Sequence, residues 1–518
     1  MALKEEVYGL IYRAEQLCRG CREAKPLVEC LNEMRSRLDE PLRVAVVGIM
    51  KAGKSTFMNA LMGASILYTG NLETTYTVGW FRYAPQPSLT ICFRDGSTQN
   101  APFEDLEKWS VRTYEKLNPR INDVKYLIIY YPSEVLKQLE FIDTPGLNSV
   151  YGTDAQNTLD FLSIKGSEDT LHEASMADAI IYAFSRSAAG YDKEILDAFH
   201  QGSGNSSPIN SIGILTKVDA TGIWDIWSDL TPVEAAQVVT KTVMDSPSIK
   251  RLLFSAYPVC AKVVEGYTQL NEVDWDALRH LSALEADCIP DFLYDAGQFS
   301  TSTDEEFQSV APFEVRTHLM NTIGQYGVVA ITELLRDGVS KGEIGEKLQK
   351  LCGIESIRQV LLSHFGTRTF LIKTRYIFTH IRSMINTLKK QALGNSQLGH
   401  ICRQIDEEME DLMSSIQVLK ELKVLQMYYN NQLSFDTPEE VEDLLHVTGE
   451  YGRSAEARLG MPEGTAVARL EETAREKTAL WHEKSGGWMH SGAYVEAAGV
   501  LARSYEQMVY HLSALSQD

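Results

Sequence analysis

The stretch Val44-Ala-Val-Val-Gly48-Ile-Met-Lys-Ala-Gly53-Lys54-Ser55-Thr56 decides the fold that we predict for this chain. An apolar run of strand length ends at a glycine, and Gly-Lys-Ser-Thr then opens the segment Phe57–Met62, which has the composition of a helix. This is the pattern G-x-x-x-x-G-K-[ST], the phosphate-binding loop that joins a strand to a helix. The sequence therefore predicts that residues 44–56 bind the polyphosphate of a nucleotide.

The residue types of this loop match what a bound polyphosphate requires. The glycines let backbone N–H groups turn toward the phosphates, and the helix N-terminus favours an anion. The Lys54 ammonium can reach the β- and γ-phosphates, and the Ser55 hydroxyl can hold Mg²⁺. The predicted nucleotide-binding residues of the loop are Gly48, Met50, Lys51, Ala52, Gly53, Lys54, Ser55 and Thr56.

From Leu42 onward, short β-branched runs alternate with turns and amphipathic segments, which is typical of α/β domains. We predict strands over 43–48, 77–83, 88–94, 125–131, 138–142, 179–184, 210–215 and 253–259. The fold class that follows is α/β, with a mostly parallel, doubly wound sheet. Ligands of such sheets lie beyond the carboxyl ends of the strands, and each motif described below follows one of those ends.

A second motif, Asp143-Thr-Pro-Gly146, follows the predicted strand Leu139-Glu-Phe-Ile142. A carboxylate that leaves a strand beside a phosphate-binding loop can hold Mg²⁺ through a water, and the Gly146 N–H can meet a γ-phosphate. Between the two motifs, residues 71–77 supply the hydroxyls from which a Mg²⁺-binding threonine would come. We choose Thr75, with Thr74 as the alternative. The predicted metal ligands are Ser55, Thr75 and Asp143.

A third motif, Thr216-Lys217-Val218-Asp219, closes the predicted strand Ser211–Leu215. The Asp219 carboxylate can accept both N1–H and N2–H of guanine, a donor pair that adenine lacks, while the Lys217 stem covers the base. These residues therefore favour GTP or GDP as the ligand. Cys260-Ala261-Lys262 follows another apolar strand, and its N–H groups can meet the guanine O6; Ser255-Ala256 is the alternative for this role.

Length and charge limit the classes of protein to which the chain can belong. At 518 residues it is too long for one core, so several domains are expected. The net charge of −21 argues against a nucleic-acid partner, because binding to phosphate backbones needs clustered Lys and Arg. No apolar run approaches the ~18 residues of a membrane span, and the start has no signal-peptide pattern. We expect a cytoplasmic protein, with a peripheral position at the inner face of the cell membrane as the alternative.

Both ends of the chain have helical periodicity. Residues 2–38 carry a heptad-like apolar seam that is interrupted at Pro26 and needs partner helices, for which the C-terminal third is the source. The segment 355–390 has the pattern of one long helix, 401–430 has another apolar face, and further helices are expected over 438–458, 463–483 and 493–515. We predict N-terminal helices over 1–40, a nucleotide-binding domain over 41–340 and an elongated helical bundle over 341–518.

The motifs in this order resemble the GTPase domain of the dynamin superfamily, and in particular bacterial dynamin-like proteins. The resemblance is carried by Gly48–Leu61 and Asp143-Thr-Pro-Gly-Leu-Asn-Ser149, and further along by Tyr326–Gly338 and Gly353–Lys373, which look like the hinge and first stalk helix of its isoniazid-induced mycobacterial branch. It extends over 41–270 and 320–390. The resemblance implies a large P-loop GTPase with GTP or GDP and Mg²⁺ as cofactors and a helical stalk, in which Lys51, Lys54, Ser55 and Thr75 act in catalysis.

The chain departs from dynamin at the residues that assist hydrolysis. Dynamin carries a Gln and then a Ser where this chain has Met50 and Lys51, and Leu147 stands where small GTPases keep a water-positioning Gln. Without a Gln at either position, hydrolysis should be slow until the protein self-assembles. We expect Lys51 to supply charge to the transition state when two GTPase domains pair; the alternative is that it binds phosphate within one subunit.

The expected partners are a second copy through the GTPase domains or a second dynamin-like chain. Membrane contact and remodelling are implied only by the resemblance, because the loop Ser485–His490 offers a single aromatic, Trp488, whose packing against the bundle we favour. Two other functions stay open. One is a regulatory or assembly-factor GTPase without membrane activity, and the other is a nucleotide-gated structural protein with little hydrolysis.

Overall fold

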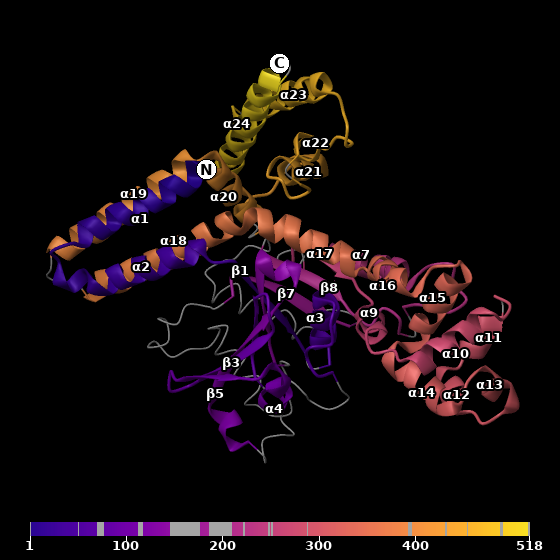
Figure 1. The fold of residues 1–518 in the computed structure, drawn as a ribbon. Coiled ribbons are helices and arrows are strands. Elements are labelled where there is room, and N and C mark those ends of the chain that lie inside the picture. Colours follow the sequence, from indigo (N-terminus) through magenta and orange to yellow (C-terminus); the bar gives the residue numbers. More distant parts are fainter. Residues whose placement is uncertain are drawn as a thin grey trace. The chain divides into compact units, whose positions relative to one another are not determined.

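The computed structural model describes residues 2–49, 51–69, 77–111, 118–145, 177–185, 210–220, 223–246, 249, 252–286, 288–391, 396–429, 432–452, 454–486 and 490–515. The chain divides into two compact units. The sheet unit contains Pro41–Ser203 and Pro208–Gly366, and the helical unit combines Met1–Glu40 with Thr367–Asp518. Figure 1 shows the strands of the first unit and the long helices of the second.

The sheet unit is built on nine strands in the order β4-β3-β5-β2-β6-β1-β7-β8-β9. The strands are β1 (Leu42–Gly48), β2 (Gly79–Tyr83), β3 (Ser88–Phe93), β4 (Thr98–Ala101), β5 (Val124–Tyr131), β6 (Leu139–Asp143), β7 (Ala179–Phe184), β8 (Ser211–Leu215) and β9 (Ser255–Pro258). The run from β6 through β1, β7 and β8 to β9 is parallel throughout, and antiparallel pairs join β2 to β6, β3 to β5 and β3 to β4. The predicted mostly parallel α/β sheet is thus confirmed.

The parallel strands are buried along almost their whole length, which explains their continuous apolar sequences. Every residue of β6, β7 and β8 is buried, and in β1 only Arg43 is partly accessible. Parallel strands have this composition because both faces of the sheet are covered. In register, Val46 of β1 lies beside Asp143 of β6, and Gly48 lies beside Ala183 of β7. This register brings the phosphate-binding loop next to Asp143.

One strand was not predicted. β4 (Thr98–Ala101) is a polar and mostly exposed edge strand, so its sequence lacks the apolar alternation that signals a strand. It forms because the Asp95-Gly96 turn folds it back on β3, with Gly96 in a left-handed conformation (φ +84°). The Asp95-Gly96 turn, rather than the composition of residues 98–101, is therefore the sequence feature that indicates this strand.

The helices of the sheet unit connect its strands and then extend beyond the last one. They are α3 (Lys54–Met62), α4 (Leu106–Ser110), α7 (Pro232–Asp245), α9 (Ala261–Tyr267), α10 (Glu272–Ser282), α11 (Cys288–Leu293), α12 (Ala296–Thr301), α13 (Glu305–Val310), α14 (Phe313–Thr322), α15 (Gly324–Arg336), α16 (Lys341–Leu351) and α17 (Ile354–Val360), with short 3₁₀ turns at Phe103–Asp105, Pro119–Asp123 and Glu134–Lys137. Helices α10 to α14 form a lobe at the lower right of Figure 1. In this lobe the buried Arg316 donates to the carbonyls of Phe299, Ser302 and Ala311.

The sheet unit continues to Gly366, whereas we predicted that the helical domain begins at residue 341. The Cys352 carbonyl accepts a hydrogen bond from the Cys260 N–H (3.0 Å), and Arg358 donates to the Leu61 carbonyl (3.2 Å). These bonds attach α16 and α17 to the sheet unit. The predicted single helix over 355–390 is also divided, because a π-helical segment, η8 (Leu361–Gly366), separates α17 from α18. Such segments are rare and local departures from the α-helix, which periodicity does not reveal.

The helical unit contains α1 (Ala2–Cys18), a 3₁₀ turn at Arg22–Ala24, α2 (Lys25–Asp39), α18 (Thr367–Gln391), α19 (Ser396–Ser415), α20 (Gln417–Tyr429), α21 (Pro438–Val447), α22 (Ala455–Leu459), α23 (Val467–Ser485) and α24 (Gly492–Leu515). Helix α1 lies beside α19, and α2 lies beside α18 (Figure 1). The apolar seam of residues 2–38 is buried there, and Pro26 is in the first turn of α2 rather than inside a helix.

Polar contacts fix the two helix pairs of this unit. Arg13 of α1 pairs with Glu408 of α19 (Nε to Oε2, 2.9 Å). The buried Arg37 of α2 donates to the Tyr376 hydroxyl of α18 (3.0 Å), and Lys373 donates to the Arg37 carbonyl (2.7 Å). The first 40 residues and the residues from Thr367 onward therefore share one core, within the helical unit.

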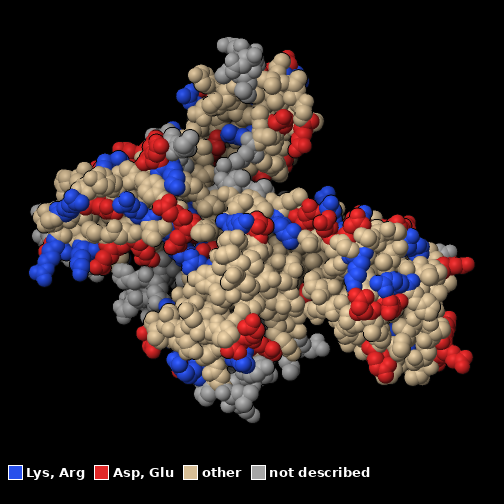
Figure 2. Space-filling view, viewed as in Figure 1, with Lys and Arg blue, Asp and Glu red and all other residues tan. Residues whose placement is uncertain are grey.

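Within the described residues, we find no helix that combines the length and the apolar character needed to cross a bilayer. On the face drawn in Figure 2, acidic and basic side chains are interspersed over the helices of both units.

Candidate functional site

The phosphate-binding loop leaves the carboxyl end of β1 through backbone conformations that favour glycine. Gly48 has φ +156°, and a Cβ placed there would lie 2.3 Å from the Ala183 carbonyl oxygen of β7. Gly53 has φ +83° and precedes Lys54, the first residue of α3. Lys51, between them, is exposed and also left-handed (φ +61°). The loop is therefore a tight turn that packs against β7 and leads directly into a helix N-terminus.

Lys54 is buried and reaches back across this loop. Its ammonium donates to the carbonyl oxygens of Gly48 (3.1 Å) and Ile49 (3.2 Å). Burial lowers the pKa of Lys54 to about 8, and the nearby Asp143 carboxylate opposes this shift. Two carbonyls thus hold the cation over the turn where a phosphate would bind.

Asp143 and Ser55 bring oxygen atoms together at the junction of β6 and α3. The Ser55 hydroxyl donates to Asp143 Oδ2 (3.2 Å), and the Asp143 side chain has no solvent exposure. Asp143 Oδ1 has no hydrogen-bond partner among the described residues. Burial raises the pKa of Asp143 to about 6, against the opposing effects of Lys54 and Ser55. A buried carboxylate oxygen without a partner, next to a hydroxyl, fits a hard divalent cation such as Mg²⁺.

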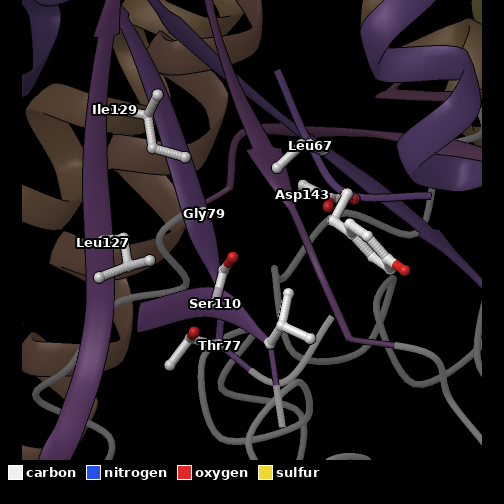
Figure 3. Close-up of a pocket in the computed structure, with 9 residues that line it drawn as sticks. Leu67, Thr77, Gly79, Ser110, Leu127, Ile129 and Asp143 are labelled. Carbon is white, nitrogen blue, oxygen red and sulfur yellow. The ribbon is translucent and has the colours of Figure 1, made fainter. Parts of the chain in front are cut away.

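Asp143 also forms one wall of a small cavity on the β2 and β5 side of the sheet (Figure 3). The other residues that line it are Leu67, Tyr68, Thr77, Gly79, Ser110, Val111, Leu127 and Ile129. Apart from Asp143 and the hydroxyl-bearing Tyr68, Thr77 and Ser110, these residues are apolar. The Thr77 hydroxyl donates to the Trp109 carbonyl (2.7 Å). Such surroundings explain why the carboxylate is poorly solvated.

Thr216 joins the end of β8 to the phosphate-binding loop. Its buried hydroxyl lies 2.6 Å from the Ala52 carbonyl and 3.1 Å from the Phe184 carbonyl. The same side chain contacts the position that a Cβ on Gly53 would take. Thr216 is therefore a buried support for the loop. Lys217 follows in a left-handed conformation (φ +55°), which turns the chain away from the strand toward Asp219.

Asp219 and Lys262 meet at the turn that begins α15. A Cβ on Gly324 (φ +71°) would lie 3.6 Å from Asp219 Oδ2 and 3.5 Å from Lys262 Nζ. The Lys262 ammonium donates to the Met320 carbonyl at the end of α14 (3.1 Å). Cys260 is the N-cap of α9, and Ala261 is the first residue of this helix. The structure thus brings Asp219 and Lys262, two of the residues predicted to bind guanine, together against the α14–α15 turn.

Other predicted residues take different places. Thr56 lies in the first turn of α3 and hydrogen-bonds to Glu265 of α9. Met50, Thr74, Thr75 and Gly146 lie outside the described residues.

Sequence reasoning missed a polar network that adjoins the site. Asn59 of α3 and Glu265 of α9 are buried, and the Asn59 amide donates to Glu265 Oε1 (2.6 Å). Asn59 stands within the otherwise apolar stretch Phe57–Met62, and a polar residue at a buried helical position was the one available signal. Its partner could not be identified, because Glu265 is 206 positions away along the chain.

Comparison with known proteins identifies the domain that carries these residues. Residues 44–218 match the model of the Dynamin family. The chain is 25% identical over 524 residues to the isoniazid-induced protein IniC of Mycobacterium tuberculosis, covering 99% of this chain and all of the relative. It is 36% identical over 126 residues to a bacterial dynamin-like protein of Nostoc punctiforme, covering 23% of this chain and 18% of that protein.

Solved structures with similarity to the chain include one described as an oligomerised bacterial dynamin pair that provides a mechanism for long-range sensing and tethering of membranes. The identity is 13% and the TM-score 0.33, and the match covers 98% of this chain and 90% of the other. The family match covers the phosphate-binding loop, Asp143 and Thr216–Val218, and together with the relatives it leads to one conclusion: residues 44–218 form a domain of the Dynamin family, and the chain is similar to bacterial dynamin-like proteins.

Proposed function

We propose that this protein binds GTP with Mg²⁺ and hydrolyses it, and that pairing of two GTPase domains accelerates the reaction. The observation that carries the proposal is the strand order β6-β1-β7-β8, which places Asp143, the phosphate-binding loop and Thr216 side by side at the carboxyl ends of the strands. Ligands of α/β sheets bind at this edge. This arrangement supports a site in which the expected phosphate, metal and base contacts would adjoin one another.

The phosphate half of the site supports binding of a triphosphate. The N-terminus of α3 and the turning backbone of the loop favour an anion, and Lys54 is already oriented over the loop by two carbonyls. Mg²⁺, which would neutralise phosphate charge when bound, would be held by Ser55 and Asp143. Thr75 remains the proposed third ligand, and Thr74 is the alternative.

The base half supports a preference for guanine. Asp219 follows β8 and lies against the same turn as Lys262. A carboxylate at this position accepts two N–H donors of guanine, whereas adenine offers no matching pair. Asp219 is half-buried, and exchange of GTP for ATP would leave this acceptor without its donors, which costs about 1–3 kcal/mol per group when the site is closed by the base.

Lys51 is the residue that we propose to act between two copies. It is exposed, and its backbone is in the left-handed conformation (φ +61°). A cation supplied in trans to the transition state can stabilise the charge that develops on the phosphates. Self-association through the GTPase domains, or pairing with a second dynamin-like chain, would bring this group to the facing site.

The decisive experiment is calorimetric titration of the nucleotide-free protein with GDP and with ADP, followed by the same titrations of Asp219→Asn. We expect GDP to bind more tightly than ADP by about 2 kcal/mol or more, the effect of losing one or two buried hydrogen bonds. The Asn variant should lose this discrimination. Equal affinities of the wild-type protein for GDP and ADP would refute the proposal. Hydrolysis is measured separately as single-turnover rates at increasing protein concentration.

A further inference from the structure

A buried carboxylate connects the two halves of the site. Glu265 lies on α9, four residues after Ala261, and is only 5% exposed. Its Oε1 atom accepts hydrogen bonds from Asn59 Nδ2 (2.6 Å) and from the Thr69 hydroxyl (2.8 Å), and the side chain also hydrogen-bonds to Thr56. No ion pair involves Glu265 within the described part of the chain. A carboxylate in this position depends on its hydrogen bonds to offset the loss of hydration.

Asn59 extends the connection to the segment that leaves α3. Its Oδ1 atom accepts from the Ile66 N–H (3.0 Å) and the Leu67 N–H (2.8 Å). Its Nδ2 atom donates to the Leu67 carbonyl (2.7 Å) as well as to Glu265. Both donors and both acceptor sites of the amide are therefore used. Residues 66–69 are held by side chains of α3 and α9 rather than by a strand or helix of their own.

The three segments joined by this network have different roles in the proposed function. Helix α3 begins with Lys54 and Ser55, which would bind the phosphates and the metal. Helix α9 begins with Ala261 and Lys262, which would bind the base. Residues 66–69 lead directly into 70–76, the part of the sequence that contains Thr74 and Thr75. Glu265 of α9 is thus bonded both to α3, through Asn59 and Thr56, and to Thr69, which precedes the expected metal-binding threonine.

We propose that Glu265 is a positioning residue. From α9, the helix that begins with the proposed base-binding residues, it holds residues 66–69 in place. Residues 66–69 in turn position the segment that follows them in the sequence, 70–76, which is proposed to contact Mg²⁺ and the γ-phosphate. The inference rests on the proposed function and deepens it. In a purely structural role, the network would stabilise the fold and affect all nucleotides equally. In a positioning role, it affects the triphosphate state more than the diphosphate state, because the diphosphate lacks the γ-phosphate that this segment would contact.

The test compares Glu265→Ala with Glu265→Gln, which keeps an acceptor oxygen for Asn59 and Thr69 but removes the charge. The readouts are affinities for GDP and for a non-hydrolysable GTP analogue with Mg²⁺, and the Mg²⁺ concentration for half-maximal hydrolysis. We expect Glu265→Ala to weaken analogue binding about tenfold, the effect of one lost charge-assisted hydrogen bond, with GDP affinity changed less than about twofold. Glu265→Gln should restore most of the loss, and Glu265→Ala should require more Mg²⁺.

Thr268→Val is the matched control. The Thr268 hydroxyl donates to the Glu265 carbonyl at the end of α9 (2.7 Å), so this change removes a hydrogen bond from the same helix without touching residues 66–69. Its ratio of analogue to GDP affinity should equal that of the wild type. Thr69→Val, which removes one bond of the network near the surface, should shift the ratio in the same direction as Glu265→Ala and serves if the latter fails to fold.

Equal losses of GDP and analogue affinity in Glu265→Ala, or an unchanged ratio in a folded Thr69→Val, would overturn the inference while leaving guanine binding intact. Failure of the wild-type protein to prefer GDP over ADP would instead overturn the proposed function, and this inference with it.

Discussion

At the scale of single residues, the pair formed by Lys54 and Asp143 determines how the site responds to pH. Both side chains are buried, and each opposes the pKa shift that burial imposes on the other. Burial nevertheless dominates and raises the pKa of Asp143 from 3.8 to about 6. The carboxylate that would hold Mg²⁺ is therefore only marginally ionised below neutral pH.

We predict that affinity for Mg²⁺ with GDP falls about tenfold between pH 7 and pH 5, because protons compete for a carboxylate that titrates near pH 6.

The contribution of Asp143 to folding stability changes with pH in the opposite direction, because it is larger at low pH than at high pH. The folded state binds this proton more tightly than the unfolded chain, so the contribution to the free energy of unfolding is present below pH 4 and is lost as pH rises through 6. Titrations and urea unfolding at each pH measure the two effects. Asp143→Asn should flatten the stability profile, and an unchanged profile would contradict the assignment.

Gly48 offers a second test at a single position. In Gly48→Ala the new Cβ would lie 2.3 Å from the Ala183 carbonyl, so the loop or β7 must move, and nucleotide affinity should fall with a loss of stability above about 2 kcal/mol. Gly63→Ala is the control, because Gly63 is left-handed (φ +75°) with no atom within 4 Å of its Cβ position. It should cost only the backbone strain of about 1 kcal/mol. If Gly48→Ala and Gly63→Ala lower nucleotide affinity and the free energy of unfolding to the same extent, the clash with Ala183 is not the cause of the loss.

At the scale of elements, the lobe formed by α10 to α14 depends on one buried cation. Arg316 is fully buried and satisfies three carbonyls, that of Phe299 in α12 and those of Ser302 and Ala311, which follow α12 and α13. Lysine could not reach all three in the same geometry, because guanidinium has five donors in a fixed plane. The lobe adjoins the proposed base-binding residues, because Lys262 is bonded to the last turn of α14.

Arg316→Met should therefore destabilise the sheet unit by about 3 kcal/mol or more, since it leaves several carbonyls without donors. Guanine affinity should fall with it, because the α14–α15 turn supports Asp219 and Lys262. Arg279→Met is the matched control, because Arg279 forms an exposed ion pair with Asp276 (2.6 Å), and such pairs contribute under about 1 kcal/mol. The two variants are compared by urea unfolding and by titration with GDP. If Arg316→Met and Arg279→Met have similar free energies of unfolding, the role assigned to Arg316 is contradicted.

Elements also show where pattern reasoning succeeds and where it fails. The buried strands β1, β6, β7 and β8 were predictable, because their apolar runs follow from burial on both faces. Strand β4 was not, because its pairing depends on the Asp95-Gly96 turn. Helices α16 and α17 lie in the sheet unit, whereas we expected the helical domain to begin at residue 341, because helical periodicity shows that a face is buried but not which surface covers it. The contacts of Cys352 and Arg358 with the sheet unit are matters of tertiary structure.

At the scale of the whole molecule, Lys51 provides the test of assembly. We predict that Lys51→Ala binds GDP within about threefold of the wild type, since an exposed lysine contributes about 0.5 kcal/mol to binding within one subunit. Its hydrolysis rate should no longer increase with protein concentration. Single-turnover rates over a hundredfold range of protein concentration measure this. Undiminished stimulation would show that Lys51 does not act between copies.

Membrane contact is tested at the loop around Trp488, which lies outside the described residues. We predict that Trp488 packs against the bundle, so Trp488→Ser should co-float with anionic liposomes to the same extent as the wild type. Trp227→Ser is the matched control, because Trp227 is 54% exposed in the sheet unit. A selective loss of flotation in Trp488→Ser would identify the loop as a membrane anchor.

The sequence by itself determined the parts of this protein whose signals are local. The phosphate-binding loop, Asp143 after β6 and Asp219 after β8 could be placed because each combines a short pattern with the end of an apolar strand. Tertiary structure alone decided which distant side chains share a buried site: Glu265 with Thr69, 196 positions apart, Lys262 with the Met320 carbonyl, and Arg37 with Tyr376. The physical reason is that a buried polar group must find a partner, and packing, not sequence spacing, determines which partner is within reach.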